Sequence, residues 1–130
     1  MDALIQAALE EDMPRGDITT ESLIPSEATA RAILLAKENG VLAGIPVAER
    51  VFKKIDASSV MSIHHRDGES VRKGDKIADI KGPAVALLKG ERTALNFLQR
   101  LSGIATTTRK FVDAVSGTRT RVLDTRKTTP

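Results

Sequence analysis

Basic residues gather in the last third of this 130-residue chain, and they are its first candidates for chemistry. Nine basic residues and three acidic ones lie between positions 89 and 127, although the formal charge of the whole chain is only +3. Such a local excess predicts an anionic partner, whether a phosphate, a carboxylate or a nucleic acid. A basic face that acidic residues elsewhere compensate would give the same composition, so charge alone leaves both interpretations open.

Arg126 and Lys127 are the strongest candidates, because they follow a short strand that we expect at 121–124. Loops after strand ends carry the ligand-binding residues of α/β barrels. A guanidinium fork binds two oxygens of a carboxylate or phosphate at once, and an ammonium adds a point charge. Thr125 could hydrogen-bond to the same ligand. On residue types alone, a solvated polar turn explains these residues at least as well.

Arg92 is a further candidate, because we expect it near the start of a long helix at 91–101. A cation is mildly unfavourable there, since the helix N-terminus already carries partial positive charge. Asn96, one turn later, offers no compensating charge. An anionic ligand would compensate the guanidinium, whereas the simpler alternative is an exposed helix residue.

Acidic residues and histidines are weaker candidates. Glu11, Asp12 and Asp17 could form a carboxylate pair for acid–base work, but we interpret them as residues that cap and terminate the first helix. His64 and His65 are neighbours in an expected strand, so their side chains should point to opposite faces. We therefore expect no shared metal site and assign both histidines a structural role.

Composition bounds the remaining classes. The chain has no Cys, which excludes disulfides and thiolate chemistry and fits a cytoplasmic protein. It has three Phe and no Trp or Tyr, so we expect an aliphatic core and no stacking platform for single-stranded nucleic acid. The N-terminus lacks the pattern of a signal peptide, and no apolar stretch approaches membrane-spanning length.

Periodicity and turn residues place these candidates on expected elements. Apolar residues at helical spacing and alternating residues at strand spacing are the main signals. Asn39-Gly40 is a hairpin signal, and Ser102-Gly103 interrupts a helical pattern. The expected helices are 2–12, 44–55, 91–101 and 105–115, the expected strands are 27–37, 41–43, 60–65, 77–80 and 121–124, short strands fold back between 67 and 77, and 17–25 is a loop.

This order of elements predicts an α+β fold with two parts. Residues 1–102 would form the first part, which combines helices with a small mixed β region. Residues 103–130 would form the first elements of a truncated α/β barrel, because a helix followed by a strand and a polar loop is how such a barrel opens. A lone last strand needs a sheet to pair with, so we expect a continuation beyond residue 130.

Four segments, taken in this order, carry a resemblance to a known enzyme family. They are Glu11-Asp12 with Gly16-Asp17-Ile18-Thr19-Thr20, Asn39-Gly40-Val41-Leu42-Ala43-Gly44, Gly90-Glu91-Arg92-Thr93-Ala94-Leu95-Asn96-Phe97-Leu98-Gln99 continued by Leu101-Ser102-Gly103-Ile104-Ala105-Thr106, and Asp124-Thr125-Arg126-Lys127-Thr128-Thr129-Pro130. The set resembles the quinolinate phosphoribosyltransferases, also called carboxylating nicotinate-nucleotide pyrophosphorylases. The last two segments are the most specific.

The resemblance implies a two-domain homodimer whose active site lies between subunits. In it, residues 1–102 would form an N-terminal α/β sandwich domain, hammerhead-like or barrel-sandwich-like, beside an incomplete C-terminal α/β barrel. Such an enzyme joins quinolinate to phosphoribosyl pyrophosphate with Mg²⁺ and releases pyrophosphate and carbon dioxide, giving nicotinate mononucleotide for NAD synthesis. It implies that Arg126 and Lys127 bind the acid groups of the substrate and that Arg92 reaches across the dimer into the neighbouring site. Thr125 stays a candidate for a hydrogen bond to the same ligand, and turn formation explains it equally well. The remaining catalytic residues and most Mg²⁺ ligands would lie beyond residue 130, so we expect no turnover from this chain alone.

Three alternatives stay open at this point. A related phosphoribosyltransferase could use another pyridine or base. A non-catalytic barrel-sandwich module is suggested by Gly68-x-x-Val71-x-x-Gly74, which resembles biotinyl and lipoyl carriers, although no matching lysine motif surrounds Lys81. A nucleic-acid binder is the least favoured alternative, because the cations are scattered and stacking aromatics are absent.

Overall fold

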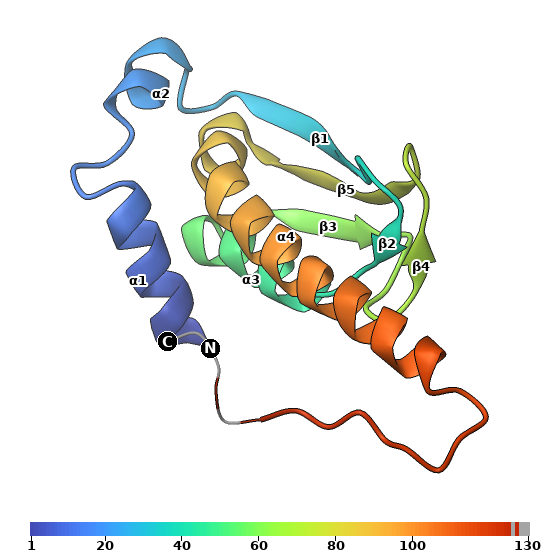
Figure 1. The fold of residues 1–130 in the computed structure, drawn as a ribbon. Coiled ribbons are helices and arrows are strands. Elements are labelled where there is room, and N and C mark those ends of the chain that lie inside the picture. Colours follow the sequence, from blue (N-terminus) through green and yellow to red (C-terminus); the bar gives the residue numbers. More distant parts are fainter. Residues whose placement is uncertain (126, 128–130) are drawn as a thin grey trace.

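The computed structural model describes residues 1–125 and 127. In chain order its elements are α1 (Asp2–Asp12), α2 (Ile18–Leu23), β1 (Thr29–Leu35), β2 (Gly40–Val41), α3 (Ile45–Ile55), β3 (Val60–Ile63), β4 (Ser70–Val71), β5 (Lys76–Pro83) and α4 (Ala84–Ala114). The architecture is mixed α/β, with α3 and α4 on one side of a strand layer and α1 beyond them (Figure 1). No helix in the described part of the chain has the length and apolar content needed to cross a membrane.

The strand layer is a three-stranded antiparallel sheet in the order β1-β5-β3. Ile80 in the central strand lies opposite Ala32 of β1 and Met61 of β3, so these residues share the face that the helices cover. A second, two-stranded sheet pairs β2 with β4 beside the first (Figure 1). The expected strands near 27–37 and 60–65 are confirmed as β1 and β3.

The hairpin expected at Asn39-Gly40 is wrong. β1 pairs with β5, whereas β2 crosses to β4 and pairs Gly40 with Val71. The Asn39 side chain accepts a hydrogen bond from the Lys73 backbone N–H at 2.9 Å, which fixes the chain at this crossing. A turn signal reports local backbone preference, while the pairing of β1 is decided by the buried face that it shares with β5.

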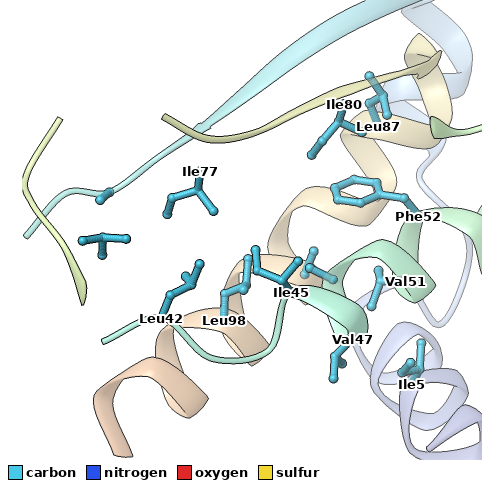
Figure 2. Packing of buried hydrophobic residues seen from close by; sticks show 14 of the residues in the cluster. Ile5, Leu42, Ile45, Val47, Val51, Phe52, Ile77, Ile80, Leu87 and Leu98 are labelled. Carbon is cyan, nitrogen blue, oxygen red and sulfur yellow. The ribbon is translucent and has the colours of Figure 1, made fainter. Parts of the chain in front are cut away.

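The core is aliphatic, as the composition predicts. Ile5, Ile45 and Val51 are its largest fully buried side chains. Figure 2 shows Ile80 of β5, Leu87 of α4 and Phe52 of α3 pointing toward one another between the sheet and the helices. Burying a side chain of this size stabilises a fold by roughly 1.5–3 kcal/mol, so this cluster is what holds the layers together.

Helix α4 differs most from expectation. It begins at Ala84, seven residues before the expected start, and runs without interruption through Ser102 and Gly103 to Ala114. Pro83 stands at its N-cap, where the missing N–H of proline costs nothing. Gly90 lets the helix lie close to α3, because a Cβ there would sit 2.8 Å from Cδ1 of Phe52. The expected break at Ser102-Gly103 is therefore wrong, and 91–101 and 105–115 belong to one helix.

Two further expectations change. The loop expected at 17–25 contains the short helix α2, whose N-cap is Asp17. The strand expected at 121–124 is absent from the described residues, which show no strand after α4. Helices α1 and α3 are confirmed at the positions that their apolar spacing predicts, with Ile5 and Leu9 buried on α1.

Candidate functional site

Arg92 lies in the third turn of α4 and not at the helix start, so the expected conflict with the helix N-terminus does not arise. Its guanidinium Nη1 donates to Oδ1 of Asp12 at 2.8 Å, which joins α4 to the last residue of α1. The Arg92 side chain is 73% exposed, whereas that of Asp12 is 18% exposed. The structure therefore supplies a carboxylate for this arginine and still leaves most of its surface open to a ligand.

The segment after α1 places two more acidic residues, Asp17 and Glu21, near Lys89 of α4. Asp17 caps α2 by accepting from the Thr20 backbone N–H at 3.0 Å. Hydrogen bonds from Thr20, with smaller contributions from the charges of Lys89 and Arg92, hold the pKa of the Asp17 carboxyl below its usual range. Asp17 is thus a cap, as interpreted, but of α2 and not of the first helix.

A cleft of about 460 Å³ opens between α1 and α4 beside this ion pair. Its lining residues are Ala8, Glu11, Asp12, Thr93, Asn96, Phe97 and Arg100. Asn96 and Arg100 lie one and two turns after Arg92 on the same helix. The cleft therefore combines acidic groups of α1 with amide and guanidinium groups of α4.

The second group of predicted residues lies past the end of α4. Thr125 and Lys127 are exposed, and the Lys127 backbone N–H donates to Thr125 Oγ1 at 3.2 Å. Arg126 lies outside the described residues. Among the described residues, no hydrogen bond or ion pair joins Arg92 to Thr125 or Lys127. Within one chain the structure therefore does not connect the two groups of predicted binding residues.

The histidines have separate structural partners. His64 Nε2 lies 2.7 Å from Asp79 Oδ2, and His65 Nδ1 lies 3.1 Å from Glu69 Oε2. Both histidines come after the end of β3 and do not lie within it. In residues 1–125 and 127 no three His, Cys, Asp or Glu side chains come together as a metal site.

Two hydroxyl groups of α4 have a role that sequence reasoning missed. Thr106 Oγ1 accepts from the Val41 backbone N–H at 2.9 Å, and Ser102 Oγ accepts from the Ala43 N–H at 3.0 Å. Thr106 thus binds β2, which pairs with β4 through other groups, and Ser102 binds the segment that follows β2. The spacing of four residues puts both on one helix face, and that spacing was the available signal.

The Asn39–Gly44 segment is built for this close approach. A Cβ at Gly40 would sit 2.7 Å from Thr106 Oγ1, and Gly44 has a φ of 103°, which favours glycine. Asp67 then caps α3 by accepting from the N–H groups of Gly44 and Ile45, each at 2.9 Å. The segment therefore fixes α3 and α4 relative to each other and contacts no candidate binding residue.

Comparison with known proteins decides the family. Residues 17–102 match the family model described as quinolinate phosphoribosyl transferase, N-terminal domain, and residues 104–130 match the C-terminal domain of the same family. The chain belongs to the quinolinate phosphoribosyltransferase family. The resemblance seen in the four sequence segments is confirmed.

Individual relatives of the quinolinate phosphoribosyltransferase family agree with this assignment. The chain is 42% identical to a probable nicotinate-nucleotide pyrophosphorylase [carboxylating] of Bacillus subtilis over 92% of this chain and 41% of the relative. It is 43% identical to the probable enzyme of Synechocystis over 100% of this chain and 44% of the relative. The crystal structure of NadC from Streptococcus pyogenes matches with a TM-score of 0.95 and 44% identity, over 99% of this chain and 46% of that one. The chain thus spans less than half the length of these relatives.

The position of Lys81 is unlike that of a carrier lysine. Carriers present a modified lysine at an exposed hairpin, but Lys81 lies in the central strand β5, opposite Arg31 of β1 and Val60 of β3. A side chain paired on both sides within a sheet is not at the tip of a turn. The position of Lys81 therefore does not fit a carrier module.

Proposed function

We propose that the complete protein carrying this chain transfers the phosphoribosyl group of phosphoribosyl pyrophosphate to quinolinate with decarboxylation. The products would be nicotinate mononucleotide, pyrophosphate and carbon dioxide, a step of NAD synthesis. The observation that carries the proposal is the family match over residues 17–102 and 104–130. Because the chain spans only 41% and 44% of two curated relatives, the activity is proposed for the complete protein and not for these residues alone.

Arg92, Arg126, Lys127 and Thr125 are the proposed substrate-binding residues of this part. Quinolinate carries two adjacent carboxylates, which paired N–H donors of arginine bind in a planar, bidentate way. The 73% exposed side chain of Arg92 supports such a role, because a ligand can reach it. The ammonium of Lys127 is exposed as well and adds positive charge.

A homodimer would bring the two groups of residues together. Arg92 has no direct contact with Thr125 or Lys127 within the described chain. We propose that Arg92 of one subunit enters the site formed around residues 125–127 of its partner. Cations gathered in this way would hold the carboxylates of quinolinate and neutralise the charge of departing pyrophosphate.

The finer architecture belongs to the same proposal. Residues 1–102 would form a hammerhead or barrel-sandwich-like α/β domain, and residues 103–130 would begin a barrel, with α4 crossing the boundary between them. Mg²⁺ would neutralise the pyrophosphate of the cosubstrate. We propose that most of its ligands lie in parts of the complete protein other than the described residues, in which no three His, Cys, Asp or Glu side chains come together as a metal site. The cytoplasm stays the predicted location.

The test is a product assay on the complete protein with the Arg92→Ala variant. We expect quinolinate-dependent formation of nicotinate mononucleotide, detected by mass spectrometry, and a loss of about 100-fold in kcat/KM for quinolinate in the variant, since a charged binding contact is removed. Arg50→Ala is the matched control, because this exposed arginine of α3 pairs with Asp2 away from the proposed site.

Two outcomes would contradict the proposal. Equal use of nicotinate and quinolinate as acceptors would show that the protein does not select the di-acid, and it would favour a related base phosphoribosyltransferase. Unchanged kinetics in Arg92→Ala would remove this residue from the substrate site while leaving the reaction itself in place.

A further inference from the structure

Asp12 and Arg92 form an unequal ion pair. The carboxylate of Asp12 is largely buried, with 18% of the side chain exposed, whereas Arg92 is 73% exposed. One nitrogen, Nη1, donates to one oxygen, Oδ1, at 2.8 Å. The pair therefore holds the guanidinium through one nitrogen, and most of the Arg92 side chain stays exposed to solvent.

The carboxylate itself has a rigid support. Asp12 is the last residue of α1, and this helix is anchored in the core by Ile5, which is 0% exposed, and Leu9, which is 9% exposed. Figure 2 shows Ile5 next to Val47 and Val51 of α3. The Met13 backbone N–H donates to Leu9 O at 3.0 Å and closes the helix end. The backbone that carries Asp12 is thus held by packed elements, and Arg92 is the more exposed partner of the two.

The neighbouring charged residues Lys89 and Asp17 bind partners other than Asp12 and Arg92. Lys89, one turn before Arg92 on α4, is bound to Glu21 of α2. Asp17 caps α2 through Thr20 and acts on Arg92 only as a more distant charge. Among the described residues, Asp12 is the carboxylate that forms an ion pair with Arg92.

We infer that Asp12 is a positioning residue that orients Arg92 for binding a carboxylate of the substrate. The inference rests on the proposed function, because it concerns the same site. A long, exposed arginine samples many rotamers, and ordering it on ligand binding costs conformational entropy. Asp12 removes part of this cost beforehand, since its carboxylate restricts Arg92 while the outer edge of the fork stays accessible.

If Asp12 only stabilised the fold, its loss would lower the melting temperature, and its effect would not require Arg92. An ion pair with a mostly exposed partner contributes little to stability, because water and salt screen it and side-chain entropy opposes it. If Asp12 instead positions Arg92, its loss should change the melting temperature little, while the KM for quinolinate should change strongly. The two roles can be separated by comparing melting temperature with kinetics, and by testing whether the effect of Asp12 requires Arg92.

The experiment compares Asp12→Asn, Asp12→Glu, Arg92→Ala and the double variant Asp12→Asn/Arg92→Ala in the complete protein, with saturating phosphoribosyl pyrophosphate. For Asp12→Asn we expect the KM for quinolinate to rise about tenfold with kcat within about twofold, because binding of the ground state and the transition state weakens alike. Asp12→Glu should restore part of the affinity. In the Arg92→Ala background, Asp12→Asn should have no further effect. Isothermal titration with quinolinate gives a second readout without turnover.

Asp2→Asn is the matched control. Asp2 lies on the same helix and binds an exposed arginine, Arg50, so the variant removes a similar ion pair from α1. We expect it to leave the KM for quinolinate unchanged. Both aspartate variants should change the melting temperature by no more than about 3 °C, because an ion pair whose arginine is mostly exposed is weak.

The failures can be told apart. If Arg92→Ala binds quinolinate normally, the substrate role of Arg92 is wrong and the positioning role of Asp12 falls with it. If Arg92→Ala is impaired but Asp12→Asn is normal, only the inference about Asp12 is overturned. An Asp12→Asn defect that persists in the Arg92→Ala background would assign Asp12 a structural role and would also overturn the inference.

Discussion

Single carboxylates connect distant parts of this chain. Asp79 of β5, whose side chain is 8% exposed, binds Arg31 of β1 at 2.6 Å, His64 at 2.7 Å and Lys76 at 2.6 Å. Hydrogen bonds from His64, then Lys76, and also from Arg31 hold the pKa of the Asp79 carboxyl well below its usual range, although burial acts in the opposite direction. The ionised form of this group is therefore part of the folded state.

The lowered pKa of Asp79 predicts a dependence of stability on pH. A carboxyl whose pKa is lower in the folded protein contributes stability above its ordinary pKa of about 3.9, and this contribution is lost as pH falls toward the folded value. We expect the urea midpoint of Asp79→Asn to fall less steeply than that of the unchanged protein between about pH 5 and pH 2.5. Asp113→Asn controls for the loss of one exposed charge on α4. Parallel curves for Asp79→Asn and the unchanged protein would contradict the role of these hydrogen bonds.

At the scale of elements, α4 holds the other elements in place. It packs against α3 through Gly90, covers β5 through Leu87, and holds β2 through Ser102 and Thr106. One continuous helix therefore fixes both sheets and carries Arg92 on its exposed side. The direction in which Arg92 is presented depends on contacts along the whole helix.

The hydroxyl of Thr106 gives a test of this arrangement. In Thr106→Val the backbone N–H of Val41, a buried residue, loses its partner. Leaving a buried donor unsatisfied costs about 1–3 kcal/mol, so we expect the free energy of unfolding to fall by that amount in chemical denaturation. Thr107→Val is the matched control, because Thr107 is exposed on the same helix. Equal stability of the two variants would mean that Thr106 does not support β2.

At the scale of the whole molecule, the candidate binding residues lie at separate places. Arg92 stands beside the cleft between α1 and α4, while Thr125 and Lys127 follow the end of α4. The second half of α4 exposes Ile104, Phe111 and Val112, with exposed fractions of 52%, 61% and 44%. The relatives of this family continue for more than the length of this chain. We therefore propose that the complete site is assembled from further parts of the protein and from its partner subunit.

This separation predicts that the 130-residue chain has no measurable turnover by itself. It presents part of the proposed anion-binding set, and among its described residues no three His, Cys, Asp or Glu side chains come together as a metal site. The measurement is formation of nicotinate mononucleotide from quinolinate and phosphoribosyl pyrophosphate by the purified chain, with the complete protein as the positive control. Detectable product from the chain would contradict the view that the site needs more than these residues.

Local patterns in the sequence determined the elements whose buried faces are made of neighbouring residues. The apolar spacing of Ile5 and Leu9 predicted α1, and the spacing of Val47, Val51 and Phe52 predicted α3. The family was also readable from short motifs, and with it the candidate role of Arg92. These features need only residues within a few turns of one another, so a periodic pattern contains them.

Tertiary structure decided what depends on residues far apart in the chain. Ser102-Gly103 is a helix breaker by local preference, but Ser102 is satisfied by the backbone of Ala43, and α4 continues. Asn39-Gly40 favours a hairpin, yet the shared buried face pairs β1 with β5. The partner of Arg92, Asp12, lies 80 positions away. No local pattern contains such a contact, because it forms only when α1 and α4 pack on the same core.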